Sequence, residues 1–299
     1  MNGLRKGKIL VVRTEHLPRP GETVLGGTFL MNPGGKGANQ AVAAARLGAD
    51  VIFVCKTGND MFGITTRQQL AQEGIDTRFV FIDDHNPSGV ALISVDSRAE
   101  NTIVVASGAN ANLLPLDVAK AETALDDCDI VLMQLETPMT TIEYVAAEAA
   151  KRGKRTVLNP APGAALSPQL LKSLYLITPN ETEAEIITGI RIHNAETEAE
   201  AARSIRAMGV QNVIITLGSR GAYICNDRFD EAVPAQKVRA VDTTAAGDVF
   251  NGALVVALSE GKSLEEAVRF ASRASAISVT RMGAQSSIPY RSEVDRFVP

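Results

Sequence analysis

The chain is organised around one stretch, Val241-Asp242-Thr243-Thr244-Ala245-Ala246-Gly247-Asp248-Val249-Phe250-Asn251-Gly252. Its small residues, Ala245 to Gly247, precede an apolar run from Val249 to Leu258, the pattern of a loop that opens into a helix. The free N–H groups and the dipole of a helix N-terminus favour an anion. Asp248 falls on the first turn, where its carboxylate could act as a base beside that anion. A plain helix start capped by Asp242 or Thr243 explains the same residues equally well.

Length and composition limit the class of protein. With 299 residues, 45% of them hydrophobic and 21% charged, the chain suits one large α/β domain with a sizeable core. A net charge of −4 with scattered Lys and Arg argues against a general nucleic-acid surface. No apolar run is long enough to span a bilayer, and the N-terminus lacks the apolar core of a signal peptide. We therefore expect a cytoplasmic, soluble protein without a membrane partner.

The cysteines and histidines do not form a metal-binding pattern. Cys55, Cys128 and Cys225 are widely spaced in apolar surroundings, which favours buried small hydrophobes over disulfides or a zinc site. The three histidines have no His or Cys partner at ligand spacing, which argues against a His-built metal site.

Strand-like and helix-like segments alternate along most of the chain. Lys8 to Val12 reads as a buried first strand, and a glycine-rich turn from Asn32 to Gln40 feeds a helix through Leu47. The other strands expected in the main sheet span residues 50–54, 77–82, 130–134, 155–158, 174–177 and 212–216, with 221–225 antiparallel. The other helices expected span residues 61–72, 139–152, 181–188, 198–208, 249–260 and 264–280. This order predicts an α/β fold with a doubly wound, mostly parallel sheet flanked by helices.

One segment interrupts this alternation. Ser88 to Val95 and Asn101 to Ala106 read as a hairpin joined by a polar loop. Together with a strand from Thr23 to Met31, they predict a small β-sheet lid formed by residues of about 13–34 and 85–107. The rest of a single domain, 1–299, would form the binding core. Exposed sheet edges give two such lids a reason to pair, so we expect a homodimer.

Polar residues follow several of the predicted strands. Glu136, Asn159, Asn180 with Glu183, and the segment from Thr216 to Gly221 all fall at carboxyl ends of strands. Each has an ordinary explanation: a solvated strand end, a capping box at Asn180 and Glu183, or a glycine turn. Their gathering on one edge of an open α/β sheet indicates a ligand site.

Two segments rich in small residues carry a resemblance to a known family. They are Gly34-Gly35-Lys36-Gly37-Ala38-Asn39-Gln40-Ala41 and Asp242-Thr243-Thr244-Ala245-Ala246-Gly247-Asp248. Between them lie Gln134-Leu135-Glu136, Asn159-Pro160-Ala161-Pro162, Thr178-Pro179-Asn180-Glu181-Thr182-Glu183 and Thr216-Leu217-Gly218-Ser219-Arg220-Gly221. From about Pro18 to the C-terminus, this order resembles the PfkB family of carbohydrate kinases, especially the members that phosphorylate ribose. One departure is Ala245, which stands where the family usually has Gly.

The resemblance implies roles for these residues. Asp248 would take the proton from a sugar primary hydroxyl that attacks the γ-phosphorus of ATP, and an anion hole would hold the developing charge. The implied anion hole is Ala245, Ala246 and Gly247. The implied sugar-binding residues are Gly35, Lys36, Gly37, Ala38, Asn39, Glu136 and Asp248. The implied ATP-binding residues are Asn180, Thr216, Leu217, Gly218, Ser219, Arg220, Gly221, Gly247 and Asp248.

Two metal ions are also implied by the resemblance. Asn180 and Glu183 would position Mg²⁺ through water, which suits an ion that keeps several waters. K⁺ would lie at the positions that match the family's activating site, mostly against backbone carbonyls. These positions are Asp242, Thr244, Ser278, Arg281, Gly283 and Ser287.

The implied activity is ATP-dependent phosphorylation of ribose at O5. A kinase for another sugar or a nucleoside is an alternative, although 4% aromatics and no Trp leave little for stacking a base. A catalytically weak sugar-binding or regulatory protein on the same fold is a second alternative. The presence of Asp248 together with Asn180 and Glu183 argues against it.

One family feature is missing from the expected place. The resemblance implies a Gly-Ser-x-Asn-x-Asp segment after the first strand, whose Asn and Asp hold sugar hydroxyls. Here no Asp or Asn lies between Lys8 and Pro18. A lost charge-assisted hydrogen bond costs about 1.5–3 kcal/mol, so we expect ribose binding to be weakened at least about tenfold with normal ATP binding.

Overall fold

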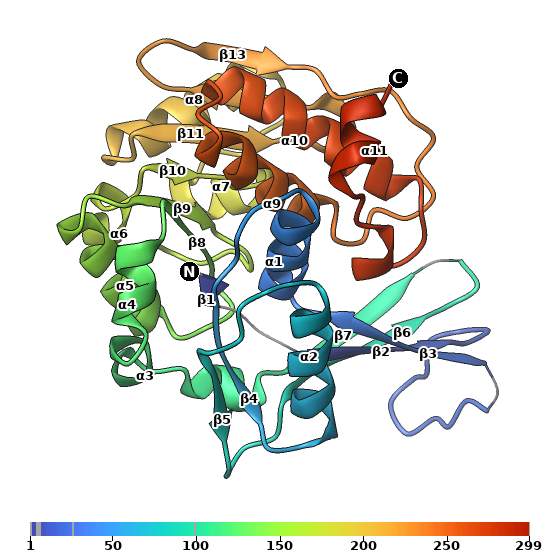
Figure 1. Cartoon of the computed structure of the whole chain (residues 1–299). Coiled ribbons are helices and arrows are strands. Elements are labelled where there is room, and N and C mark those ends of the chain that lie inside the picture. The colour runs from blue at the N-terminus through green and yellow to red at the C-terminus, as the bar shows by residue number, and fades with distance from the viewer. Residues whose placement is uncertain (1, 4–6, 26, 99, 299) are drawn as a thin grey trace.

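The fold is a long twisted α/β sheet with a separate small sheet at one side (Figure 1). A computed structural model describes residues 2–3, 7–25, 27–98 and 100–298. One part of the main sheet has the order β13-β12-β11-β10-β9-β8, and the other has the order β1-β4-β5, with β1 beside β8. The strands are β1 (Asn2–Gly3), β4 (Phe53–Gly58), β5 (Val80–Asp83), β8 (Ile130–Gln134), β9 (Arg155–Asn159), β10 (Leu176–Ile177), β11 (Asn212–Thr216), β12 (Ala222–Cys225) and β13 (Asp230–Val233).

All strand pairs of the main sheet are parallel except those made by β12 and β13. Helices cover both faces, and alternate residues of the strands enter two separate cores. Leu132 packs on one side, whereas Val131 and Met133 pack on the other. The doubly wound, mostly parallel sheet predicted from the sequence is therefore confirmed, including the antiparallel β12.

The helices divide between the two faces. On one face are α1 (Lys36–Arg46), α2 (Met61–Gln72), α9 (Ala246–Ser259), α10 (Leu264–Val279) and α11 (Arg291–Arg296). On the other are α3 (Pro115–Ala119), α4 (Glu122–Asp127), α5 (Met139–Lys151), α6 (Pro168–Lys172), α7 (Glu181–Thr188) and α8 (Ala195–Ala207). Short 3₁₀ turns are η1 (Gly108–Asn112), η2 (Gly218–Arg220) and η3 (Gln285–Ser287).

Local capping explains several helix boundaries. Asn180 and Glu183 form a capping box at the start of α7, and Ser263 and Glu266 do the same for α10. Helix α8 begins three residues earlier than expected because Asn194 accepts a hydrogen bond from the N–H of Thr197.

The small sheet is built from the segments predicted to form a lid and keeps that name below; its strand order is β3-β2-β6-β7. Its strands are β2 (Gly7–Arg13), β3 (Thr28–Gly34), β6 (Gly89–Val95) and β7 (Asn101–Ala106). The antiparallel hairpin of β6 and β7 is confirmed. Gly26 and Ala99, which fall in the predicted lid segments, lie outside the described residues, as do Met1, Leu4, Arg5, Lys6 and Pro299.

The assignment of Lys8–Val12 to the first strand of the main sheet was wrong. These residues lie in β2, which pairs antiparallel with β3 and parallel with β6 along its whole length. The main sheet instead receives β1, paired with β4 at Phe53 and Val54. An apolar, β-branched run suits any half-buried pleated surface, so its composition does not tell which sheet it joins. The lid therefore begins at about residue 7, not 13.

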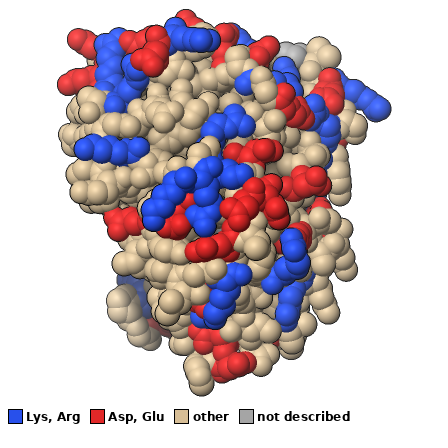
Figure 2. All heavy atoms as spheres, turned by 60° about the vertical axis from the view of Figure 1, so that its left-hand side comes forward, with Lys and Arg blue, Asp and Glu red and all other residues tan. Residues whose placement is uncertain are grey.

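No helix in the described part of the chain is long and apolar enough to cross a membrane. The three cysteines, all within the described residues, form no disulfide; Cys55 and Cys225 are buried, as expected, and Cys128 is half-buried. Figure 2 shows Lys and Arg interspersed with Asp and Glu over the face drawn.

Candidate active site

Asp248 lies at the N-terminus of α9, on the first turn, and is only 6% exposed. Helix α9 begins after Ala245, whose φ of 62° places it in the left-handed region and which makes no side-chain cap. Asp242 does not cap the helix, because its Oδ1 accepts from the N–H and hydroxyl of Thr244. The ordinary capped helix start considered from the sequence is therefore not what the structure contains.

The amides of this first turn point away from the helix body, as in any α-helix, and they lack intrahelical acceptors. The N–H of Ala246 is bonded to the carbonyl of Thr243 at 3.2 Å. Of the predicted anion hole, Gly247 is the residue best placed in the helix to present its amide to a ligand, next to the Asp248 carboxylate.

Two amides from α1 hold the Asp248 carboxylate. Asn39 Nδ2 donates to Oδ2 at 2.8 Å, and Gln40 Nε2 donates to Oδ1 at 3.1 Å. Burial raises the pKa of the Asp248 carboxyl above its ordinary value, opposed by the charge of Lys36 and by these two hydrogen bonds. A carboxyl with a raised pKa is a stronger base once ionised.

The predicted sugar-binding segment lies at the N-terminus of α1. Gly35, with a φ of 99°, precedes the helix, and Glu136 Oε2 accepts the backbone N–H of Lys36 at 3.0 Å. Gly37, Ala38 and Asn39 are buried on the first turns. The structure thus brings residues 35–39 together with Glu136, from the end of β8, beside Asp248.

Asn180 and Glu183 lie at the start of α7. Their side chains and backbone amides bond reciprocally: Asn180 N to Glu183 Oε2 at 2.9 Å, and Glu183 N to Asn180 Oδ1 at 2.8 Å. Burial raises the pKa of Glu183, the hydrogen bond from the Asn180 amide and the charge of Lys36 oppose that rise, and Asp248 adds to it. Lys36, Asp248 and Glu183 are therefore close enough to interact electrostatically.

The predicted nucleotide segment, Thr216–Gly221, continues β11 through η2. Thr216 N–H donates to the carbonyl of Pro179 at 2.9 Å, and Thr216 forms an isolated parallel β-bridge with Asn180. This contact joins the nucleotide segment to the start of α7. Within the segment, Leu217 is buried and Gly218 and Gly221 have positive φ values.

Arg220 differs from the other residues predicted to bind ATP. Its guanidinium pairs with Glu198, and with Glu181 at 2.6 Å. These ion pairs connect η2 to α7 and α8. Because they occupy the Arg220 side chain, the backbone of Thr216–Gly221 is more available to a nucleotide than this side chain is.

The positions predicted for K⁺ gather where α10 ends. Asp242 Oδ2 accepts the N–H of Gly283 at 2.8 Å, and the hydroxyls of Ser278 and Ser287 lie 3.2 Å apart. Arg281 N–H donates to the carbonyl of Ser278 at 3.0 Å. Thr244 joins this group through Asp242. No three His, Cys, Asp or Glu side chains of the described residues cluster to hold a metal.

The residues from Lys8 to Pro18 do not lie where the resemblance implies the Gly-Ser-x-Asn-x-Asp segment, which would follow the first strand of the main sheet. Lys8 to Pro18 follows no strand of the main sheet, because β2 belongs to the lid. The position after β1 falls on Leu4, Arg5 and Lys6, which lie outside the described residues. The absence of Asp and Asn between Lys8 and Pro18 is therefore no reason to expect weakened ribose binding.

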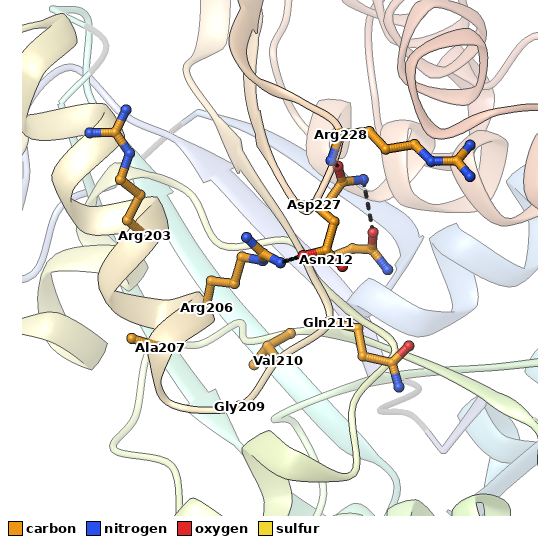
Figure 3. A pocket seen from close by; sticks show the side chains of 10 residues that line it. Arg203, Arg206, Ala207, Gly209, Val210, Gln211, Asn212, Asp227 and Arg228 are labelled. Atoms are coloured by element: carbon orange, nitrogen blue, oxygen red, sulfur yellow. Dashed lines mark hydrogen bonds and ion pairs between the residues drawn. The ribbon is translucent and has the colours of Figure 1, made fainter.

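A surface hollow of about 730 Å³ lies at the opposite edge of the sheet, near the start of β11 (Figure 3). Its Arg206 pairs with Asp227, and Arg203 pairs with Asp230. Figure 3 shows Arg228 extending away from these two arginines. Both arginines are therefore paired with nearby carboxylates, and the predicted site residues lie at the other end of the strands.

Sequence reasoning missed Gln40 and Gln134, both fully buried next to the site. Gln134 ends the apolar run Ile130-Val131-Leu132-Met133, and Gln40 lies in a helix rich in alanine. A glutamine within such an apolar pattern could have indicated a residue of the site, because buried polar groups need hydrogen-bond partners.

A buried carboxylate on the first turn of a helix, close to residues from α1 and the end of β8 on a doubly wound sheet, fits the arrangement expected of a sugar kinase. The profile of the pfkB family carbohydrate kinases matches residues 9–291, and the chain belongs to this family.

Individual relatives agree with this assignment. The chain is 46% identical to a ribokinase of Haemophilus influenzae over 288 residues, covering 96% of this chain and 94% of the relative. It is 39% identical to the solved ribokinase of Thermotoga maritima, with a TM-score of 0.89 and 98% and 97% of the two chains covered. Arabidopsis thaliana ribokinase, solved with ribose and ATP, is 32% identical, with a TM-score of 0.92 and 99% and 98% covered.

The buried Asp248 carboxylate should cost folding stability at neutral pH. Since its pKa is raised in the folded protein, stability is fully present below the unfolded pKa, about pH 4, and is lost as the pH rises through the folded pKa. We expect Asp248→Asn to be more stable than the parent chain at pH 7, with a higher midpoint of urea unfolding, and the difference to close below about pH 4. Asn39 can turn its amide to fit, because its Oδ1 has no partner among the described residues.

Asp83→Asn is the matched control. The side chain of Asn112 and the amides of His85 and Asn86 lower the pKa of Asp83 to about 2. Its contribution is present above the unfolded pKa and lost as the pH falls, so this variant should be less stable at pH 7. Equal stability of Asp248→Asn and the parent chain at pH 7 would contradict a raised Asp248 pKa.

Proposed function

We propose that this chain transfers the γ-phosphoryl group of ATP to O5 of D-ribose. One observation carries the proposal: a buried carboxylate, Asp248, lies on the first turn of α9 and is held by two amides of α1. The named ribokinases among the relatives, at 40–46% identity, support ribose as the substrate.

Asp248 acts as the base in this reaction. Its carboxylate accepts the proton of the ribose O5 hydroxyl as O5 attacks the γ-phosphorus. The O5–P bond forms, the bond from phosphorus to the β,γ-bridging oxygen breaks, and ADP leaves with that electron pair. The first-turn amides at Gly247 stabilise the negative charge on the equatorial oxygens of the phosphoryl group.

The neighbouring residues bind the two substrates. The backbone of residues 35–39, the Asn39 amide and Glu136 bind the ribose hydroxyls. Glu136 is held at the N-terminus of α1 because it accepts a hydrogen bond from the Lys36 backbone N–H. The segment Thr216–Gly221 holds the nucleotide through its backbone, alongside Asn180. The related ribokinase of Arabidopsis thaliana, solved with ribose and ATP, supports these two ligands as the substrates.

The residues at the start of α7 fit an indirect Mg²⁺ role. Asn180 Oδ1 and Glu183 Oε2 are already engaged in the capping box. This leaves the remaining Glu183 oxygen for a water of a hydrated ion brought in with the phosphates. Bound there, Mg²⁺ would neutralise charge on the β- and γ-phosphates. Burial and Asp248 raise the pKa of Glu183, so a nearby cation would favour its ionised form.

K⁺ is proposed at the end of α10, against backbone carbonyls at Asp242, Thr244, Ser278, Arg281, Gly283 and Ser287. Asp242 bridges Thr244 and Gly283 there, so an ion would brace the loop that leads into α9 without touching ribose.

We also propose that the enzyme works in the cytoplasm, where a kinase of this kind has ATP available.

The lid offers a surface for a homodimer. Side chains of directly paired residues point to the same face of a sheet. On one lid face, a row of paired residues is Met31, Leu10, Leu92 and Val104, with Val12 and Phe29 beside it. Five of these six are 37–64% exposed: Val12, Phe29, Met31, Leu92 and Val104. An apolar patch of this kind marks an association surface.

A related sugar is the second candidate. Deoxyribokinases of Salmonella are 37% identical over 94% of this chain, which favours 2-deoxyribose as an alternative acceptor. The two sugars differ only by the 2-hydroxyl, which does not take part in the transfer.

The substrate is tested by measuring ADP formation with ribose, 2-deoxyribose, hexoses and nucleosides. We expect ribose to give the highest kcat/KM. Asp248→Asn should bind nucleotide normally and lower kcat by roughly two to four decades, the usual worth of a positioned base. If no sugar supports turnover, a binding protein on the kinase fold becomes the better explanation. Near-normal turnover of the variant would remove Asp248 as the base.

The K⁺ site is tested by replacing K⁺ with tetramethylammonium at constant ionic strength. We expect kcat/KM to fall about tenfold or more, equivalent to about 1.4 kcal/mol of transition-state stabilisation. Asp242→Asn should blunt this difference because it loosens the loop between Thr244 and Gly283. Equal rates in the two cations would exclude the site.

The dimer is tested by analytical ultracentrifugation at micromolar concentration. Leu92→Lys places a charge in the apolar lid face and should yield monomers. Val105→Lys is the control, because Val105 neighbours Val104 on β7 and therefore points to the opposite lid face. A monomeric parent chain, or equal dissociation by both variants, would contradict a dimer through this face.

A further inference from the structure

A row of buried amides lies beneath the Asp248 carboxylate. Gln40, fully buried on α1, uses both of its N–H groups: one donates to Asp248 Oδ1 and the other to Asn159 Oδ1, each at 3.1 Å. Its Oε1 accepts from Gln134 Nε2, at the end of β8. Every polar atom of the Gln40 side chain is therefore engaged.

The row continues to the first turn of α9. Asn159 Nδ2 donates to the backbone carbonyl of Thr178 at 3.1 Å, and the Thr178 hydroxyl donates to Asn251 Oδ1 at 2.6 Å. Asn251 Nδ2 then donates to the carbonyl of Gly247 at 2.8 Å. These hydrogen bonds therefore connect Asp248, by way of the ends of β9 and β10, to Gly247, the residue that precedes it in the chain.

The direction of these hydrogen bonds is fixed by their acceptors. An ionised carboxylate and a backbone carbonyl can only accept, so Gln40 must turn its amino group toward Asp248 and Asn159 must turn its own toward Thr178. Gln40 Oε1 then needs a donor, which Gln134 provides. Turning either glutamine amide over would set two donors or two acceptors against each other.

We propose that Gln40 is a positioning residue that fixes the orientation of the Asp248 carboxylate, and that Gln134 acts through Gln40. The inference rests on the proposed function, since it assigns the orientation of that reaction's base. Both glutamines are fully buried: the Gln40 side chain reaches Asp248 from α1, and the Gln134 side chain bonds to Gln40 alone among the described residues.

Removing the Gln40 donor has two consequences. The Asp248 carboxylate can rotate about its remaining bond to Asn39, so fewer molecules hold the reactive geometry. The ionised carboxylate also loses a donor, which raises its pKa further and moves the acid limb of kcat/KM to higher pH. Lys36 on α1 and Glu183 on α7 are the charged groups that act on Asp248, and neither is altered.

The test compares Gln40→Met and Gln134→Met, which keep side-chain volume and remove the amides. For Gln40→Met we expect kcat to fall about tenfold or more, ribose KM to change less than threefold, and the acid limb to rise by about one pH unit. Gln134→Met should move both quantities in the same direction by less. The double variant should resemble Gln40→Met, because Gln134 acts only through Gln40.

Thr141→Val is the matched control. The Thr141 hydroxyl, buried on α5, donates to the carbonyl of Leu113 at 2.7 Å, so its loss removes a buried hydrogen bond away from the site. This variant should lose stability and keep the pH profile. A purely structural role for Gln40 would give the same pattern as Thr141→Val: a lower melting temperature with an unchanged acid limb, and that result would overturn the proposal.

A readout without turnover separates this inference from the proposed function. Carboxyl-¹³C NMR of Asp-labelled protein gives the pKa of Asp248 directly, with Asp248→Asn identifying its signal. A higher pKa in Gln40→Met supports the positioning role even if ribose proves not to be the substrate. An unchanged pKa in both folded glutamine variants overturns it, even if ribose is phosphorylated rapidly.

Discussion

The close packing of α1 on α9 determines where the polar groups of the site lie. A Cβ atom added at Gly252 would lie 2.6 Å from Ala43 Cβ and 2.7 Å from the carbonyl of Gln40, so the two helices meet where α9 has no side chain. This separation lets the short amide side chains of α1 reach the Asp248 carboxylate. A larger residue at the crossing would push the helices apart by more than a hydrogen bond can stretch.

The site retains a destabilising group for its chemistry. Burial disfavours the charged form of Asp248, while Lys36 and two amide donors offset part of that cost. If the amides stabilised the charge fully, the carboxylate would be a weak base; without them, its pKa would be raised further. The hydrogen bonds to Asn39 and Gln40 therefore set both the orientation and the basicity of one group. If Asp248 is the base, as proposed, the buried amides that contact it bear on activity as well as on folding.

The sequence predicted the parts of this protein that local patterns encode. The boundaries of α2, α7, β8 and β11, and the β6–β7 hairpin follow from caps, turn residues and periodicity over a few turns, whereas α9 begins three residues before the predicted 249. The strand-end residues could also be grouped on one edge, because parallel topology brings those ends together. Partners chosen in three dimensions could not be predicted. Lys8–Val12 suited either sheet, and the pairing of Arg220 with Glu181 and Glu198 could not be foreseen from the segment Thr216–Gly221.

The position of β2 and β3 in the lid also explains how the small sheet is joined to the site. Strand β3 ends at Gly34, and α1 begins at Lys36, so only Gly35 separates the lid from the helix that holds Asp248. Gly35 adopts a positive φ of 99°, a conformation that other residues rarely take, and the Lys36 amide is bonded to Glu136. A shift of β3 must therefore be absorbed at Gly35 or passed to the N-terminus of α1. The small sheet and the segment proposed to bind the sugar are therefore joined directly through one residue, Gly35.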